Sequence, residues 1–306
     1  MAIEADYAVR KTREYLDSIL VEERLIDSKV PSQDFELYGK HFSTPIMTPA
    51  FSHLKTFVKE QKNGMYEYSL AAKKVNAVNW VGMCENDEFS EIQESGADTI
   101  RIIKPYADRD KIFSQIAFAE KCSALAVGID IDHIFGTDGK CDCVMGETMA
   151  CQTLHDITEY VKATKLPFVV KGVLSVKDAV KCMDAGVQGI VVSHHHGRLP
   201  FAVPPLLVLP DIVKEVGKYK SLKIFVDCGI DSGYDAFKAL ALGADAVSAG
   251  RVLMPPLAKE GSVGVEKYLI QMKEQLAYIM AFCGCSTLKK IDSSVLYQLD
   301  GKLVKE

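Results

Sequence analysis

The sequence GIVVSHHHGR at residues 189–198 joins a buried-strand pattern to a group of reactive side chains. Gly189–Ser193 is a short run rich in β-branched residues, which is typical of a fully buried strand. Three histidines and an arginine follow within five residues. Because parallel α/β folds place their active sites where strands end, this junction predicts such a fold. It also makes His195 and Arg198 candidate functional residues.

Seven further apolar segments share this strand pattern, and amphipathic stretches separate most of them. The eight predicted strands are Thr44–Thr48, Ala77–Val81, Thr99–Ile103, Leu125–Ile129, Phe168–Lys171, Gly189–Ser193, Lys223–Val226 and Ala246–Ala249. The phrases ESGAD, DAGVQ and ALGAD precede three of them, each with a glycine suited to the end of a helix. Eight strand–helix units predict an α/β fold of the closed (β/α)8 TIM-barrel type. An open doubly wound sheet is the alternative.

The composition is that of an ordinary soluble globular protein, with 306 residues, 48% hydrophobic and 25% charged. We interpret residues 1–306 as one barrel domain, in which residues 1–40 form an N-terminal extension that is helical over 5–25. A net charge of −5 without a block of like charge argues against nucleic-acid binding, and no apolar run approaches membrane length. Nine scattered cysteines and a start unlike a secretory signal predict a cytoplasmic protein.

Chemically useful side chains stand at the ends of the later predicted strands. They are Asp130, Lys171, Ser193, His195, Arg198, Asp227, Gly229, Gly250 and Arg251. In a barrel these strand ends face one mouth, so residues far apart in the sequence meet there. The glycines and Arg251 predict a phosphate site, because backbone N–H groups and guanidinium groups bind phosphate oxygens. The alternative is that the glycines only form turns.

His195 is a candidate general base, because imidazole titrates near neutral pH, and Asp130 is the candidate to orient it. Burying a lysine is costly, so Lys171 is predicted to meet an anion or an electron-rich ring. The alternative is a lysine that extends from the strand end to solvent.

Metal ligation is a competing interpretation of the three adjacent histidines. Neighbouring residues of an extended chain point to opposite sides, and no HExxH-type spacing is present. A second candidate is His133 with Cys141 and Cys143, whose isolated CxC fits a solvent-facing loop with reduced thiols. We therefore predict no metal site.

Taken together, these motifs resemble the FMN-dependent α-hydroxy-acid oxidases and dehydrogenases, relatives of glycolate oxidase and lactate oxidase. The resemblance covers roughly residues 40–295. PFVVKGVLSVKDA (167–179) is similar to the family's lysine-bearing strand, GIVVSHHHGR to its SNHGGR signature, and KIFVDCGIDSGYDAFKALALGADAVSAGR (223–251) to its flavin-phosphate segment. STPIMTPA (43–50) resembles the first strand, which backs the flavin ring, and AFCGCSTLKKI (281–291) resembles the C-terminal helix region.

The resemblance implies an FMN enzyme that oxidises a small 2-hydroxy acid such as lactate or glycolate. The implied catalytic set is His195, which takes the substrate proton as hydride passes to flavin N5, with Asp130 beside it, Lys171 near flavin N1, and Arg198 on the substrate carboxylate. The implied cofactor contacts are Thr48, Pro49, Ala50, Lys171 and Ser193 at the ring, and Asp227, Gly229, Gly250 and Arg251 at the ribityl chain and phosphate.

Several positions depart from the family pattern. His194 stands in place of an asparagine, His196 in place of a glycine, and Asp231 in place of an arginine of the phosphate segment. The second substrate arginine has no match in residues 131–140. We predict that Lys104 takes its role as a second anion contact.

Other functions fit the same pattern. An FMN-dependent isomerase or reductase would use the same barrel, and a flavin-free lyase or isomerase of a phosphorylated sugar would use the same phosphate site. A non-catalytic descendant would keep ligand binding alone. The expected partner is a small anionic substrate, the resemblance implies a homo-oligomer such as a tetramer, and loop 131–150 is predicted to be a mobile lid.

Overall fold

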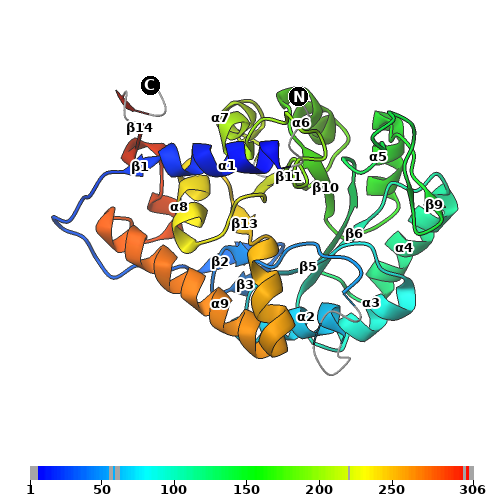
Figure 1. Cartoon of the computed structure of the whole chain (residues 1–306), viewed down its shortest axis with the longest axis horizontal. Helices are drawn as coiled ribbons and strands as arrows, with labels where there is room; N and C mark the ends of the chain where they lie inside the picture. Colours follow the sequence, from blue (N-terminus) through cyan, green and yellow to red (C-terminus); the bar gives the residue numbers. More distant parts are fainter. Residues whose placement is uncertain (1–5, 55–57, 59–62, 220, 299–300, 303–306) are drawn as a thin grey trace.

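Eight parallel strands form one sheet that curves into a nearly closed barrel (Figure 1). The computed structural model describes residues 6–54, 58, 63–219, 221–298 and 301–302. The strands are β4 (Ile46–Met47), β5 (Asn79–Val81), β6 (Thr99–Ile103), β7 (Ala126–Asp130), β10 (Phe168–Val173), β11 (Gly189–Val192), β12 (Lys223–Val226) and β13 (Ala246–Ser248). Their order in the sheet is β4-β13-β12-β11-β10-β7-β6-β5. The predicted barrel is therefore confirmed, and the open doubly wound sheet is wrong.

A helix follows each strand of the barrel. Within the described residues these are α2 (Gly64–Val75), α3 (Asn86–Gln93), α4 (Arg109–Lys121), α5 (Leu154–Lys162), α6 (Val176–Asp184), α7 (Pro205–Val216), α8 (Gly233–Ala241) and α9 (Met254–Phe282). The glycines of the three recurring phrases, Gly96, Gly186 and Gly243, have φ angles of 69°, 81° and 100°. They supply the left-handed residue that ends the preceding helix, as the sequence predicted.

The strands are buried on both faces, which explains their continuous β-branched runs. Every residue of β6, β7, β11 and β13 is buried. One hydrophobic cluster lies between the sheet and the helices, and a second, which includes Trp80, Val169 and Phe225, fills the barrel interior.

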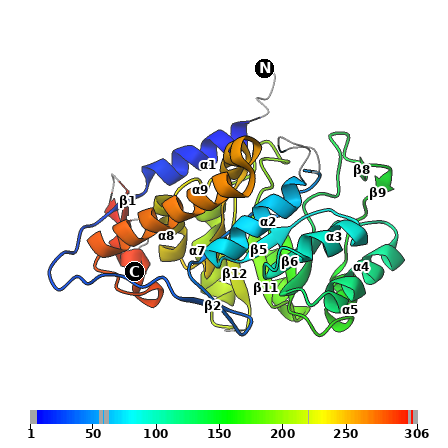
Figure 2. The same cartoon turned by 90° about the horizontal axis from the view of Figure 1, so that it is seen from below.

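A hairpin closes the barrel at the amino ends of its strands. It consists of β2 (Phe35–Leu37) and β3 (Lys40–Phe42), and its side chains Phe35, Leu37 and Phe42 join the interior cluster. The Tyr38 hydroxyl donates to the carbonyl of Gln188, just before β11. Figure 2 shows β2 at the opposite end of the molecule from α1 and β8–β9. The hairpin thus covers the amino ends, and the predicted site residues lie at the opposite mouth, at the carboxyl ends of the strands.

β4 and β5 are not paired by a ladder of backbone hydrogen bonds, and local contacts close the barrel between them. Phe51 forms an isolated parallel bridge with Val81. The fully buried Thr48 hydroxyl donates to Asn79 Oδ1 at 2.7 Å and accepts from the backbone N–H of Trp80 at 3.0 Å. The Thr48 side chain thus joins the two end strands of the sheet.

Replacing Thr48 with valine is expected to lower the free energy of unfolding by about 1–3 kcal/mol, because it leaves two buried polar groups without a partner. Chemical denaturation measures this effect. Thr48→Ser keeps the hydroxyl and serves as the control. A valine variant as stable as the parent would show that Thr48 does not close the barrel.

The segments outside the barrel are short. They are α1 (Tyr7–Ser18), β1 (Leu20–Val21), β8 (Cys143–Val144), β9 (Glu147–Thr148), the 3₁₀ helices η2 (Arg251–Leu253), η3 (Leu288–Lys290) and η4 (Ser293–Val295), β14 (Leu296–Gln298) and β15 (Gly301–Lys302). The predicted helix over 5–25 is too long: α1 ends at Ser18, because Leu20 and Val21 pair with β14. Residue 5 lies outside the described residues.

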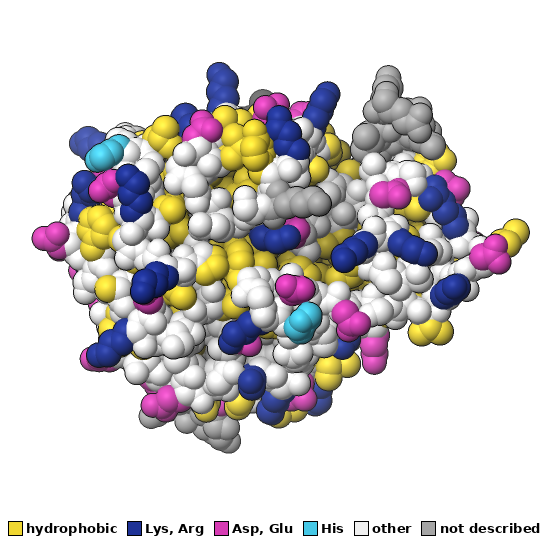
Figure 3. Space-filling view, turned by 180° about the vertical axis from the view of Figure 1, so that it is seen from behind, with side chains coloured by type: hydrophobic (Ala, Val, Ile, Leu, Met, Phe, Trp, Pro, Cys, Tyr) yellow, Lys and Arg dark blue, Asp and Glu magenta, His cyan; other side chains and the backbone are white. Residues whose placement is uncertain are grey.

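The surface mixes charges of both signs. On the face in Figure 3, Lys and Arg side chains lie among Asp and Glu, and hydrophobic side chains show in a hollow near the centre. That face does not show the large basic patch typical of nucleic-acid binding, as far as the described residues extend. Across the same part of the chain, the helices are too short or too polar to pass through a bilayer.

Candidate active site at the barrel mouth

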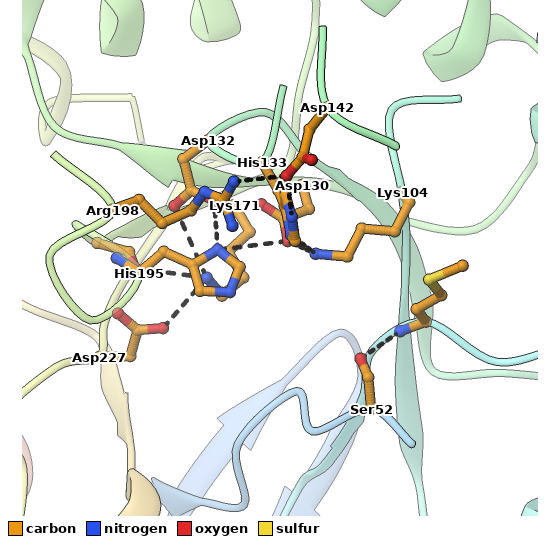
Figure 4. Close-up of polar contacts among 12 residues, drawn as sticks. Ser52, Lys104, Asp130, Asp132, His133, Asp142, Lys171, His195, Arg198 and Asp227 are labelled. Atoms are coloured by element: carbon orange, nitrogen blue, oxygen red, sulfur yellow. Dashed lines mark hydrogen bonds and ion pairs between the residues drawn. The ribbon is translucent and has the colours of Figure 1, made fainter. Parts of the chain in front are cut away.

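Lys171 lies at the centre of the polar cluster in the mouth (Figure 4). Its ammonium is 3.5 Å from Asp227 after β12 and 3.9 Å from Asp132 after β7, and it donates to Ser193 Oγ after β11 at 3.4 Å. Burial alone would lower the pKa of Lys171, but the nearby aspartates raise it by more than burial lowers it. The side chain is therefore charged. Lys171 is buried and does not extend to solvent.

His195 is held by a carboxylate. Its Nδ1 lies 2.5 Å from Asp132 Oδ1 and 3.6 Å from Asp130 Oδ2. The Asp132 carboxylate accepts from Nδ1–H, which leaves Nε2 as the nitrogen that can exchange a proton with a ligand. The residue expected to pair with His195 was Asp130, but the shorter contact is to Asp132, two residues later.

Asp130 is engaged mainly by Lys104. Lys104 Nζ is 2.6 Å from Asp130 Oδ2 and 3.0 Å from His133 Nδ1, and both members of the ion pair are buried. Burial alone would raise the pKa of Asp130, but the Lys104 and Lys171 charges hold it well below its usual range. Lys104 therefore neutralises Asp130, and its ammonium does not point freely into the mouth as a second anion contact would.

Three side chains around this ion pair could in principle bind a metal ion. Ligand-type atoms of Asp130, His133 and His195 lie within 4.8 Å of one another. The Lys104 ammonium already bridges two of these residues, so a cation of the protein occupies this position. We assign no metal here.

The three adjacent histidines form a turn, and the extended chain assumed from the sequence is wrong. His195 and His196 have positive φ angles of 47° and 57°, and the N–H of Gly197 donates to the carbonyl of His194. His194 Nδ1 accepts from the Gly197 N–H, and its Nε2 contacts Thr12 Oγ1 at 2.8 Å. Left-handed backbone at two successive histidines is unusual and concentrates at functional sites.

The histidines also differ in charge. Burial and the Arg251 charge lower the pKa of His196 to about 4, and burial lowers the pKa of His194. For His195, burial and Lys171 lower the pKa, but Asp130 and Asp132 outweigh them and raise it. Of the three, only His195 is therefore stabilised in its protonated form.

Arg198 contacts the loop that follows β7. One guanidinium nitrogen donates to Asp142 Oδ2 at 3.0 Å and to the carbonyl of Phe135 at 3.1 Å. Asp142 Oδ2 also accepts from His133 Nε2 at 3.1 Å. The backbone of Thr148 and Ala150 hydrogen-bonds to the segment after β6, so the loop is anchored at its far end. The loop thus reaches the mouth through Asp142.

Helix α1 covers the tips of β11 and β12. A Cβ at Gly229 would lie 2.7 Å from Leu16 and 2.9 Å from Thr12, so α1 packs directly on this glycine. Arg13 pairs with Asp235 at 2.7 Å, lies 3.9 Å from Asp231, and donates to the carbonyl of Gly229. Arg13 thus brings a guanidinium from α1 to the segment after β12 that contains Asp231.

The tip of β13 is open by comparison. A Cβ at Gly250 would meet no heavy atom within 4 Å, and Arg251 beside it is exposed. Pro49 and Ala50 follow β4, the strand that pairs with β13, and a Cβ on Gly82 would lie 2.7 Å from the carbonyl oxygen of Ala50. The predicted cofactor residues therefore all lie at the carboxyl ends of the barrel strands, although their contacts with a ligand stay a prediction.

Sequence reasoning missed three residues of this site. Asp132 had a signal, because carboxylates at positions i and i+2 of an extended segment share a face, as Asp130 and Asp132 do. Asp142 and Arg13 had none, because a loop and a distant helix bring them to the mouth.

Comparisons with known proteins agree on one family. A family model described as FMN-dependent dehydrogenase matches residues 2–148 and 143–298. Glycolate oxidase of Spinacia oleracea is 28% identical over 95% of this chain and 88% of its own length, and a peroxisomal (S)-2-hydroxyacid oxidase of Arabidopsis thaliana is 28% identical over 87% and 81%. An L-lactate oxidase of Roseobacter is 37% identical, but the match covers 54% of this chain and 44% of that protein. A mandelate oxidase solved with an FMN adduct superposes with a TM-score of 0.84 at 27% identity, over 94% of this chain and 91% of its own.

Proposed function

The chain belongs to the FMN-dependent dehydrogenase family, and from this premise we propose that it oxidises a small 2-hydroxy acid to the 2-oxo acid, with His195 as the base. It is an FMN-dependent oxidoreductase of the α-hydroxy-acid oxidase type, and its cofactor is FMN. The choice among lactate, glycolate and related acids is part of the proposal.

The charges at the mouth and the open space beside Gly250 support FMN as the group bound there. FMN carries a phosphate and a ring that becomes anionic on reduction, and both favour nearby cations. Arg251 is an exposed cation next to Gly250, beside which there is open space, so this strand end would hold the phosphate. Lys171 is a buried charged lysine that would lie at the ring. One oxygen of Asp132 is buried without a hydrogen-bond partner, which also leaves an acceptor for a ligand in the mouth.

The main support for the proposal is the hydrogen bond between His195 Nδ1 and Asp132. When bound, FMN accepts the two electrons that leave the substrate with the hydrogen on C2. The chain has to remove the hydroxyl proton, and His195 Nε2 would be the base, because Nδ1 is engaged by Asp132. Lys171 and Arg251 supply positive charge and take no proton.

Arg198 supports an acid as the substrate. It follows the histidine turn, and its guanidinium already binds a carboxylate, that of Asp142. Guanidinium groups bind carboxylates in a fixed geometry, so a substrate carboxylate would bind where Asp142 lies now. Lys104 is a weaker candidate for this role, because Asp130 holds its ammonium at 2.6 Å.

The test is the absorption spectrum of the FMN-loaded protein under anaerobic conditions. We expect glycolate, L-lactate or mandelate to bleach the flavin band, and Arg198→Met to raise the half-saturating concentration of the acid at least about tenfold. Arg198→Lys, which keeps the charge, is the matched control. A flavin that dithionite reduces and none of these acids reduces would contradict the proposal and favour an isomerase or reductase.

The wider organisation is part of the same proposal. Residues 1–306 would act as one domain, supported by the contacts that α1 makes with the strand tips. The homo-oligomeric state, the cytoplasmic location and the mobility of loop 131–150 stay predictions. Size-exclusion chromatography with light scattering tests the first of these.

A further inference from the structure

We propose that His133 binds the substrate carboxylate together with Arg198, by donating a hydrogen bond from Nε2 to the place that a carboxylate oxygen of Asp142 now fills (Figure 4). This inference rests on the proposed oxidation of a 2-hydroxy acid and adds a residue that recognises it. The basis is one atom: Asp142 Oδ2 accepts from Arg198 at 3.0 Å and from His133 Nε2 at 3.1 Å. Both distances are those of hydrogen bonds. A carboxylate of the chain itself is thus held by this pair of donors.

The proton of the His133 ring is on Nε2. Nδ1 lies 3.0 Å from Lys104 Nζ, and a lysine ammonium only donates, so Nδ1 accepts. Burial and the Lys104 charge lower the pKa of His133 to about 4, so at pH 7 the ring is neutral and carries one proton. With Nδ1 as the acceptor, that proton is on Nε2 and points to Asp142. Lys104 therefore makes His133 a hydrogen-bond donor for a carboxylate.

The carboxylate that these donors hold is able to leave. The Asp142 side chain is 29% exposed, so water can solvate it once it turns away. The Arg198 and His133 side chains are 28% and 15% exposed, so a small acid can reach them. Asp130 differs in this respect, because it is 4% exposed and lies 2.6 Å from Lys104 Nζ. Displacing Asp142 therefore costs less than displacing the buried partner of Lys104.

The exchange also leaves the charge of the site unchanged. The hydrogen bond from Arg198 lowers the pKa of Asp142, so its side chain is a carboxylate at pH 7. A substrate carboxylate would bring the same charge and accept the same two hydrogen bonds. His133, being neutral, adds no ion pair and acts through its N–H alone.

The position of His133 suits a 2-hydroxy acid. Its ring centroid lies 5.6 Å from that of His195, and the two ring planes are nearly perpendicular, at 87°. The carboxylate and the hydroxyl of a 2-hydroxy acid are on adjacent carbons. The residue that binds the carboxylate therefore has to lie beside the base that takes the hydroxyl proton, as His133 does.

The experiment is a calorimetric titration of the FMN-loaded protein with oxalate, a two-carbon dicarboxylate that has no C–H bond to oxidise. His133→Phe keeps a ring but removes the donor, and we expect it to weaken oxalate binding about tenfold or more, as for a lost hydrogen bond to a charged group. His133→Gln places an amide N–H near the position of Nε2 and is expected to restore most of the affinity. His41→Phe, at an exposed histidine of β3 at the other end of the barrel, is the control and is expected to change nothing.

The effect of His133 on Asp142 has to be separated from its effect on the ligand. Asp142→Ala removes the carboxylate that occupies Arg198, so it is expected to strengthen oxalate binding. In this background His133→Phe is still expected to cost about tenfold. An equal affinity with and without His133 in the Asp142→Ala background would overturn the inference, as would a parent protein that does not bind oxalate.

NMR of 15N-histidine-labelled, FMN-loaded parent protein gives a second test that needs no folded phenylalanine variant. The His133 signals are assigned by their loss in His133→Gln. We expect an unprotonated Nδ1 and a protonated Nε2, whose signal shifts on addition of oxalate. An Nε2 signal that saturating oxalate leaves in place would refute the role of His133. Neither test requires turnover, so a failure of the proposed function shows separately, as a flavin that no 2-hydroxy acid bleaches.

Discussion

Replacing His195 with glutamine is expected to slow the reduction of bound flavin by a 2-hydroxy acid by about two to four orders of magnitude, the usual contribution of a general base. Glutamine keeps a polar side chain near Asp132 but cannot take a proton. In the parent protein the rate should rise with pH as His195 loses the proton that its raised pKa retains. Anaerobic stopped-flow measurement at saturating substrate tests both results.

His196→Gln is the matched control, because His196 lies in the same turn but is neutral at pH 7, its pKa being lowered to about 4. We expect it to keep most of the activity. Equal losses in the two variants would mean that the turn matters only for structure. A His195 variant within a few-fold of the parent would remove it from the mechanism.

Replacing Lys171 with methionine is expected to lower the free energy of unfolding at pH 7 by about 3–5 kcal/mol, the usual cost of removing one partner of a buried ion pair. Lys171 is the cation nearest to Asp227 and also lies 3.9 Å from Asp132. Without it, both carboxylates would lose a nearby cation that compensates their charge. The variant should also bind FMN more weakly. Chemical denaturation and FMN fluorescence measure the two effects.

The stability loss should depend on pH. Burial alone would raise the pKa of Asp227, but Lys171 lowers it, so the stabilisation from this carboxylate is present above its unfolded pKa and lost as the pH falls through the folded value. The difference between Lys171→Met and the parent is therefore expected to shrink as the solution is acidified below pH 5. Lys171→Arg keeps the charge and is the control. A methionine variant that matches the parent at pH 7 would contradict the charge argument.

The barrel could be predicted from the sequence because the buried strands are short apolar runs, several of them rich in β-branched residues, and a glycine-ended helix precedes three of them. β6 and β12 have the predicted bounds, and the convergence of Lys171, Ser193, His195 and Asp227 follows from the parallel strand order alone. All eight strands run in the same direction, so a residue that follows any of them lies at the same end of the barrel.

Partners within the mouth could not be predicted in the same way. The choice between Asp130 and Asp132 depends on Lys104, which comes from another strand and takes one of the two carboxylates. The role of Arg13 depends on where α1 packs, and no periodicity in residues 7–18 shows this. The extended geometry assumed for the histidines failed because two of them adopt left-handed backbone, which short-range propensity does not favour.

The contact between Asp142 and Arg198 has a consequence for any small acid that reaches the mouth. The loop carboxylate is covalently tethered beside the guanidinium, so it competes as an occupant at an effective concentration that does not fall on dilution. A free acid would have to displace the Asp142 carboxylate from Arg198. Its apparent affinity would therefore fall with the fraction of time that Asp142 is bound there. If Arg198 binds the substrate as proposed, acids that make a second contact in the mouth are expected to bind better than acids held by Arg198 alone.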